Sequence, residues 1–173
     1  RPINLHMSAL EQLGASITQS HGYVDASAPN GLRGAHISFD RITVTGTEDV
    51  LMAAVLARGE TVIENAAREP EVSDLASLLT GMGARIEGAG TSTIHVRGVE
   101  RLHGAVHTII ADRVEAGTFL VAGAITGGDV VVADCVPEHV QALTVKLRQA
   151  GADVSDAGPG ALRVRRSGKL RAV

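Results

Sequence analysis

The sequence predicts an α/β (α+β) fold assembled from a repeated unit of about 70 residues, which is longer than the common helical solenoid repeats. The first observation is a phrase that occurs three times, each time as an apolar helical run closed by glycine and continued by a strand. Its copies are LEQLGASI at 10–17, LLTGMGARI at 78–86 and VKLRQAGADV at 145–154. The second observation is their spacing, since Gly14, Gly83 and Gly151 lie 69 and 68 residues apart. We therefore expect one compact motif to be used repeatedly.

Each copy of the phrase ends a helix whose start is also marked. Pro2, Pro70 and Pro137 precede the three glycines by 12, 13 and 14 residues. Proline is favoured at the first helical position because an N–H there would have no intrahelical partner, and glycine is favoured just past the last position. The sequence thus predicts three closing helices with both ends marked.

A second kind of helix is predicted over residues 47–58. Thr47 is its expected N-cap and Gly59 its expected stop. Residues 50–56, VLMAAVL, form an apolar run without a polar face. Such a helix is usually buried, so we expect it to lie inside the fold.

The counterpart of this helix is predicted to start at Asp112, which stands in capping-box spacing with Glu115, and to stop at Gly127. β-Branched runs follow both helices, at 61–63 and at 130–132. Runs of this composition predict strands.

A hairpin is expected to complete each unit. Residues 85–86 are predicted to pair near residues 93–96 across the turn Gly88-Ala89-Gly90. Each unit would then consist of helix, strand, helix, Gly-Ala turn and hairpin.

The composition argues against several functions. The formal net charge is −3 and only 2% of residues are aromatic, so the chain lacks both a basic surplus for phosphates and rings for base stacking, and we expect no nucleic-acid partner. The apolar runs are too short to span a bilayer and no signal peptide is evident, so no membrane association is expected. One cysteine, Cys135, excludes an internal disulfide and favours a reducing, cytoplasmic location.

Generic catalytic and metal-binding motifs are scarce. The sequence contains no P-loop, GxGxxG, GxSxG, CxxC or HExxH pattern. His103 and His107 have helical ligand spacing, but Gly104 and β-branched neighbours place them in an extended stretch, so no metal is expected. Cys135 precedes the helix start at Pro137, and we expect it to be a small buried residue. The alternative is a reactive thiol, because a position near a helix start can lower the pKa of a thiol.

Two segments concentrate polar side chains where helices are expected to begin. Residues 64–71, ENAAREPE, hold three carboxylates, an amide and a guanidinium, and residues 1–6, RPINLH, place an arginine beside a helix start. A helix N-terminus next to arginine is a ready anion site, because free N–H groups, the helix dipole and a bidentate cation converge there. Helix capping without any ligand is the alternative for residues 64–71. An irregular chain terminus is the alternative for residues 1–6, and both alternatives stay open.

Three stretches carry a family resemblance. They are RPINLHMSALEQLGA from residue 1, RITVTGTEDVLMAAVLARGETVIENAAREPEVSDLASLLTGMGARIEGAGT from residue 41 and DRVEAGTFLVAGAITGG from residue 112. Together they resemble the UDP-N-acetylglucosamine 1-carboxyvinyltransferases, also called UDP-N-acetylglucosamine enolpyruvyl transferases. The resemblance covers essentially the whole chain, and IENAAREPE and DRVEAGTF are its most specific parts.

The resemblance implies a particular architecture. In that family six units form two similar domains, each an inside-out α/β barrel with three helices inside and sheets outside, and substrates bind in the cleft between the domains. Residues 1–104 would be the later part of the first domain and residues 105–173 the first part of the second. Because the chain opens with Arg1 directly in a helix, we expect a fragment of about two and a half units.

The resemblance also implies a reaction. The family's enzymes transfer an enolpyruvyl group from phosphoenolpyruvate to the 3′-hydroxyl of UDP-N-acetylglucosamine and release phosphate, in the first committed step of peptidoglycan synthesis. They require neither a cofactor nor a metal. Addition and elimination proceed through a tetrahedral ketal, so the site must deprotonate a hydroxyl, protonate a methylene carbon and hold anionic oxygens.

Residue by residue, the resemblance implies two segments that bind UDP-N-acetylglucosamine. They are Arg1, Pro2, Ile3, Asn4 and Leu5, and then Arg41, Ile42, Thr43 and Val44. A hinge-organising role between the domains is implied for Glu69, Glu71, Asp112 and Arg113. No catalytic residue is expected in this chain, because the family's reactive cysteine would precede Arg1 and Cys135 does not match it. The isolated chain is accordingly expected to lack transferase activity.

Two alternatives remain at this stage. The sister enolpyruvyl transferase that acts on shikimate 3-phosphate shares the repeat fold, although RPINLH and IENAAREPE favour the UDP-sugar enzyme. A non-catalytic repeat module would use its sheet faces for protein contacts, but it would have no reason to keep both sugar-binding segments. Because unpaired sheet edges can pair with another chain, self-association is also expected at high concentration.

Overall fold

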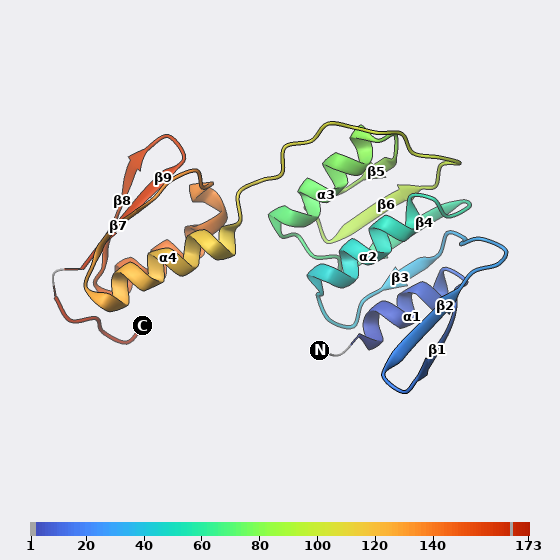
Figure 1. The fold of residues 1–173 in the computed structure, drawn as a ribbon, viewed down its shortest axis with the longest axis horizontal. Coiled ribbons are helices and arrows are strands. Elements are labelled where there is room, and N and C mark those ends of the chain that lie inside the picture. Colours follow the sequence, from blue (N-terminus) through green and yellow to red (C-terminus); the bar gives the residue numbers. More distant parts are fainter. Residues whose placement is uncertain (1–2, 167) are drawn as a thin grey trace. The chain divides into compact units, whose positions relative to one another are not determined.

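The computed structural model describes residues 3–166 and 168–173, which form two compact units, one ending at Ile109 and one beginning at Ile110 (Figure 1). Arg1 and Pro2 therefore lie outside the described residues. The first unit contains α1 (Asn4–Gln12), β1 (Ser16–Ser20), β2 (Tyr23–Ser27), β3 (His36–Ser38), α2 (Val44–Ala54), β4 (Glu60–Glu64), α3 (Pro70–Gly81), β5 (Arg85–Glu87) and β6 (Thr93–Arg97). The second contains α4 (Arg113–Thr126), β7 (Asp129–Val132), the 3₁₀ turn η1 (Pro137–Val140), α5 (Gln141–Ala150), β8 (Asp153–Gly158) and β9 (Ala161–Arg165).

The strand order of the two units confirms the predicted repetition. The first unit has a two-stranded sheet, β1-β2, and a four-stranded sheet in the order β3-β4-β6-β5. The second has a sheet in the order β7-β9-β8, which repeats β4-β6-β5. In both, a helix separates the first strand from an antiparallel hairpin that folds back beside it. The predicted mixed α/β fold is thus confirmed, including the hairpin β5–β6.

The glycines that end the closing helices adopt the predicted left-handed backbone. Gly14, Gly83 and Gly151 have φ values of 96°, 101° and 102°, a region that favours glycine because a Cβ atom is strained there. Pro70 occupies the first turn of α3, and Pro137 opens η1, which continues directly into α5. The glycines therefore mark the ends of all three closing helices and Pro70 and Pro137 the starts of two, while Pro2 lies outside the described residues.

The start of α2 differs from the prediction. Thr43 is the N-cap, with its Oγ1 accepting a hydrogen bond from Gly46 N at 3.2 Å. Thr47 is instead buried within the helix, where its hydroxyl donates to Thr43 O at 2.8 Å and accepts from Ala67 N at 3.0 Å. The assignment of Thr47 as N-cap was wrong because its hydroxyl serves a tertiary contact to a segment 20 residues away.

The end of α2 also comes earlier than predicted. The helix stops at Ala54, ahead of the expected stop at Gly59. The backbone that would continue it is bonded elsewhere, since Val55 O accepts from Val99 N and Arg58 N donates to Leu32 O, each at 2.9 Å. These tertiary hydrogen bonds replace the helical ones.

The helix α4 has the predicted boundaries. Asp112 Oδ1 accepts from Val114 N at 2.7 Å and from Glu115 N at 3.1 Å, so Asp112 caps the helix. At the other end Gly127 has φ 72° and closes it in the left-handed conformation. The strands predicted after α2 and α4 are confirmed as β4 and β7.

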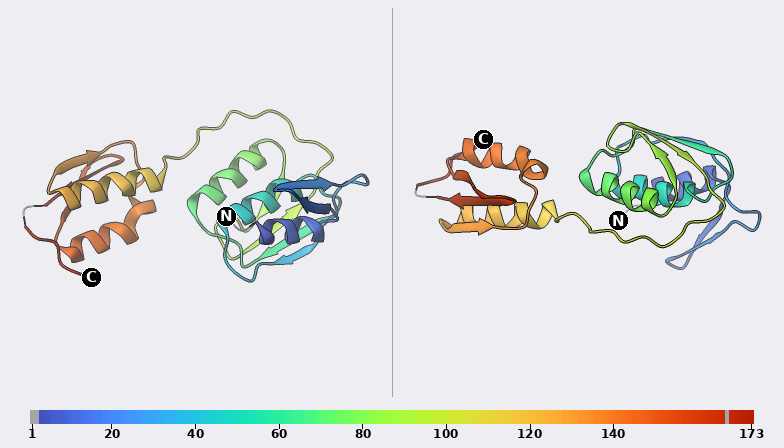
Figure 2. Two further views of the ribbon diagram at one scale, coloured as in Figure 1. Left: turned by 60° about the horizontal axis from the view of Figure 1, so that its bottom comes forward. Right: turned by 90° about the horizontal axis from the view of Figure 1, so that it is seen from above.

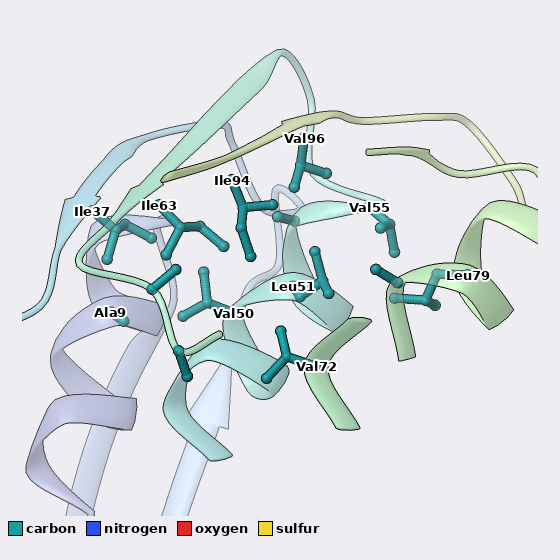
Figure 3. Packing of buried hydrophobic residues seen from close by; sticks show 14 of the residues in the cluster. Ala9, Ile37, Val50, Leu51, Val55, Ile63, Val72, Leu79, Ile94 and Val96 are labelled. Atoms are coloured by element: carbon teal, nitrogen blue, oxygen red, sulfur yellow. The ribbon is translucent and has the colours of Figure 1, made fainter. Parts of the chain in front are cut away.

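The core of the first unit lies between its helices and its four-stranded sheet (Figure 3). α2 packs against both α1 and α3, and Val50, Leu51 and Ala54 on it are 0% exposed. Met52 and Leu56, however, are 47% and 52% exposed. The prediction of a run buried on all sides is therefore correct for one face only.

The opposite faces of the sheets are polar. Arg97 pairs with Glu60 at 2.7 Å across β6 and β4 in the first unit, and Arg165 pairs with Asp153 at 2.8 Å across β9 and β8 in the second. Both pairs are at least half exposed. In the four-stranded and the three-stranded sheet, helices cover one side and solvated ion pairs lie on the other, as helices inside and sheets outside require.

The second unit has its own core around Leu120, Ala124 and Val164, each 0% exposed. Its helices α4 and α5 pack against each other (Figure 2). A Cβ atom on Gly117 would come within 2.9 Å of Leu143 Cδ2. Glycine at this position therefore permits the close approach of the two helices.

Candidate functional site

Two polar loops of the first unit meet at one edge of its sheet. β3 and β4 are parallel, with Ile37 opposite Ile63 and Ser38 opposite Glu64, so their carboxyl ends coincide. Residues 39–43 lead from β3 into α2, and residues 65–69 lead from β4 into α3. Ligands of open α/β sheets bind at this kind of edge, which identifies it as the candidate site (Figure 1).

The segment Arg41–Val44 forms the entry to α2. Arg41 is exposed and Ile42 is 56% exposed, so both side chains are available to a ligand. Thr43 is engaged in capping and Val44 packs against the core. The cap depends on Gly46, because a Cβ atom there would lie 2.5 Å from Thr43 Cγ2.

The start of α1 lies beside the start of α2. His6 Nε2 is 3.0 Å from Thr45 Oγ1 and 3.8 Å from Asp49 Oδ2. Ile3 and Asn4 are exposed ahead of it, whereas Leu5 packs against the core. The structure thus brings together the described parts of the two predicted sugar-binding segments, and Arg1 and Pro2 of the first lie outside the described residues.

His6 and Thr45 were not among the predicted site residues. The sequence signal for His6 is its place at the end of the segment RPINLH, and that for Thr45 is its place directly after Val44. Their partnership arises from the packing of α1 on α2, which a local pattern does not reveal. His6 therefore connects the starts of the two helices that carry the segments.

The loop before α3 is held by side-chain hydrogen bonds. Asn65 adopts φ 54° and its Nδ2 donates to Phe39 O at 2.7 Å. Ala67 N donates to Thr47 Oγ1 in α2. These bonds attach the loop to the end of β3 and to α2, and they place Glu69 and Glu71 at the start of α3.

Three helices consequently begin near one another. α1 is joined to α2 through His6, and α2 is joined to α3 through Thr47. Free N–H groups and the positive ends of helix dipoles attract anions. Acidic side chains lie in the same place, and the pKa of Glu48 is raised by its burial and then by Glu71, Asp49 and Glu69.

Replacing Glu48 by glutamine is expected to stabilise the chain at neutral pH. Folding raises the pKa of the Glu48 carboxyl. The folded chain therefore becomes less stable as the pH rises above the ordinary pKa of this group, 4.5, because ionising the carboxyl costs more in the folded state than in the unfolded state. The melting temperature of the Glu48→Gln variant should therefore exceed that of the wild type at pH 7, and the difference should shrink at pH 4. Melting curves at both pH values measure this, and a gain that is equal or larger at pH 4 would contradict it.

The second unit carries the other two predicted hinge residues. Asp112 caps α4, and Arg113 is the first residue of that helix. Arg113 lines a groove of about 460 Å³ between α4 and the η1–α5 segment, together with Val114 and His139. Glu69 and Glu71 belong to the first unit, so the interdomain role of all four residues stays a prediction.

The two histidines with ligand spacing do not act together. His103 Nδ1 is 3.0 Å from Gly104 O, and His107 Nε2 is 2.9 Å from Asp74 Oδ1. Across residues 3–166 and 168–173, no group of three or more histidine, cysteine, aspartate or glutamate side chains could hold a metal ion. Cys135 is 7% exposed, in agreement with its expected role as a small buried residue.

Within the described part of the chain, no helix combines the length and the apolar character that crossing a membrane requires. The longest helix, α4, has 14 residues.

The family of the chain follows from a comparison with family models. The model described as EPSP synthase (3-phosphoshikimate 1-carboxyvinyltransferase) matches residues 1–173. The chain belongs to the EPSP synthase family. Two solved structures share its fold. The enolpyruvyl transferase NikO from Streptomyces tendae superposes with a TM-score of 0.79 at 23% identity, covering 99% of this chain and 44% of that one. EPSP synthase from Acinetobacter baumannii superposes with a TM-score of 0.68 at 24% identity, covering 100% of this chain and 41% of that one.

Within the family, the chain is similar to curated proteins named UDP-N-acetylglucosamine 1-carboxyvinyltransferase, which confirms the resemblance identified from the sequence. The relative from Solibacter usitatus is 70% identical over 173 residues, and that from Acidobacterium capsulatum is 62% identical over 173 residues. Both alignments cover 100% of this chain. The chain spans 41% and 39% of the length of these two relatives.

Proposed function

We propose that this chain belongs to an enzyme that transfers an enolpyruvyl group from phosphoenolpyruvate to the 3′-hydroxyl of UDP-N-acetylglucosamine and releases phosphate. The similarity to relatives named for this reaction, 70% identity over the whole chain in one case, supports the proposal. The chain would contribute part of the UDP-sugar site. The reaction would serve peptidoglycan synthesis, and hence cell-wall formation and division, in the cytoplasm.

The observation that carries this proposal is the meeting of Ile3–Leu5 and Arg41–Val44 at two adjoining helix starts. His6 links the segments through Thr45 at 3.0 Å. A nucleotide-sugar needs a site for its diphosphate next to a surface for its base and sugar. Helix N-terminal N–H groups and the exposed Arg41 provide the first, since both favour phosphate oxygens.

The exposed side chains would contact different parts of the nucleotide-sugar, according to their chemistry. Arg41 would neutralise diphosphate charge, and Ile42 would offer apolar surface to the ligand. Asn4 provides both a donor and an acceptor for a polar ligand edge without adding negative charge. The lack of charge at Asn4 matters because four carboxylates already lie around the starts of α2 and α3.

We further infer that residues 1–104 and 105–173 belong to successive domains of the enzyme, joined by a linker whose first residues, up to Ile109, pack with the first unit. Glu69 and Glu71 would support the site from the first domain, and Asp112 and Arg113 from the second. The capping of α4 by Asp112 supports a positioning role for that residue, because the cap fixes where the helix begins.

Titration with UDP-N-acetylglucosamine tests the proposal on this chain. Amide shifts in ¹⁵N-labelled protein should concentrate at residues 3–6 and 41–46. Replacing Arg41 by alanine should weaken binding about 10-fold or more, since a charge-assisted hydrogen bond contributes about 1.5–3 kcal/mol. Replacing the exposed Arg85, on β5, is the matched control and should leave the affinity unchanged. Shifts spread evenly over the chain, or equal losses in both variants, would overturn the assignment.

The second candidate is the sister enzyme that acts on shikimate 3-phosphate. The description of the matching family model favours it. The same titration with shikimate 3-phosphate separates the two. Shifts at residues 3–6 and 41–46 with this ligand but not with the UDP-sugar would replace the first proposal by the second.

A further inference from the structure

The chain that joins the two units returns along α3 before it leaves the first unit (Figure 1). After β6, Leu102 packs against the core and His103 N donates to Met82 O at 2.9 Å. The next contact lies further back on the helix, where a Cβ atom on Gly81 would be 3.7 Å from Ala105 Cβ. The path therefore runs antiparallel to α3, towards its N-terminal end.

This path ends at a pair of side chains. His107 Nε2 lies 2.9 Å from Asp74 Oδ1, in the second turn of α3. We propose that Asp74 and His107 form a latch that holds the linker on α3, so that motion between the two units is confined to residues 108–111. The inference concerns the linker and does not depend on the proposed function.

Burial distinguishes this pair from the surface ion pairs. The side chains of His107 and Asp74 are 19% and 15% exposed, whereas those of Arg97 and Glu60 are 62% and 67% exposed. Exposed pairs contribute little because water and salt screen them. A largely buried hydrogen bond between two ionisable groups is screened less, so it can hold a segment that has few other contacts.

The neighbours of His107 show that it is the anchor of this stretch. Val106 is fully exposed and Ile109 is 77% exposed. Both residues leave most of their apolar surface in solvent, so their burial does not hold the linker in place. Beyond His107 the next fixed point is Asp112, whose side chain caps α4. Residues 108–111 lie between these two fixed points; Thr108 and Ile109 are exposed, whereas Ile110 and Ala111 are partly buried.

The latch sets the length of the tether. The four residues between the two fixed points reach at most about 14 Å when extended, at roughly 3.5 Å per residue. If the latch opened and the chain became free from Gly104 onwards, eight residues would reach about 28 Å. Asp74 lies one turn from the start of α3, so the closed latch releases the linker near the end of the unit where α1, α2 and α3 begin.

Backbone relaxation of the ¹⁵N-labelled 173-residue chain tests this inference. In the wild type, order parameters of about 0.85 are expected up to residue 107 and below about 0.6 at residues 108–111. The Asp74→Ala variant should lower the values at residues 105–107 to below about 0.6. Asp74→Asn keeps an acceptor for His107 and should retain most of the order. Ser77→Ala, at an exposed position on the same helix, is the control and should change nothing.

A second variant keeps the test decisive if Asp74→Ala disturbs α3. His107→Ala removes the other partner from the linker side and should release the same residues while α3 keeps its wild-type amide shifts. The inference is overturned if residues 105–107 of the wild type are as mobile as residues 108–111, or if His107→Ala leaves their order unchanged. No ligand enters the measurement, so its outcome is independent of the nucleotide titration.

Discussion

Replacing Leu51 by alanine is expected to lower the free energy of unfolding of the first unit by about 2–5 kcal/mol. Leu51 is 0% exposed and lies in α2 at the centre of the core (Figure 3). The truncation removes buried methyl groups and leaves a cavity that the surrounding helices and sheet can close only in part. Urea unfolding followed by circular dichroism measures the loss.

The matched control is Leu56→Ala. Leu56 belongs to the same apolar run but is 52% exposed, so its truncation should cost less than about 1 kcal/mol. Comparable losses for the two variants would mean that the run is buried on all sides, as the sequence alone suggests, and would contradict the structure.

Replacing Gly98 by alanine should destabilise the first unit by at least about 2 kcal/mol, because the added methyl group overpacks a fixed backbone contact. A Cβ atom at this position would lie 1.6 Å from Ala57 O and 2.8 Å from Ala57 C. Neither backbone segment can easily move away, since Gly98 N donates to Gly59 O and Val99 N donates to Val55 O, each at 2.9 Å. Thermal unfolding of the variant measures the effect.

Gly104→Ala provides the control for this substitution. Gly104 lies in the same connecting stretch, but a Cβ atom on it would meet nothing within 4 Å. Its replacement should change the melting temperature by no more than a few degrees. An equal loss for both variants would show that lost glycine flexibility, and not the contact with Ala57, causes the destabilisation.

The helix boundaries show what local sequence can predict. The closing helices and α4 end at glycines whose left-handed backbone is a local property, and the predictions for Gly83, Gly127 and Gly151 are confirmed. The predictions for both ends of α2 were wrong because long-range hydrogen bonds decide where this helix begins and ends. The hydroxyl of Thr47 accepts from Ala67 N, and Val55 O accepts from Val99 N. A local sequence pattern contains neither of these partners.

The candidate site, too, was predicted from the sequence only in part. The resemblance identified from the sequence supplies the two sugar-binding segments, but it does not explain how residues more than 35 positions apart form one surface. Packing of α1 on α2 brings them together. His6 and Thr45, which join the segments, are recognised only after this packing is known.

The sequence by itself determined the repeated α/β unit, the family and the residues expected to meet a nucleotide-sugar, because helix punctuation, β-branched runs and motif strings depend only on neighbouring residues. The tertiary structure alone decided which face of α2 is buried, where that helix begins and ends, and how the linker is held by Asp74 and His107. The physical reason is that burial and long-range hydrogen bonds depend on partners distant in the chain, and these are specified only once the units have folded.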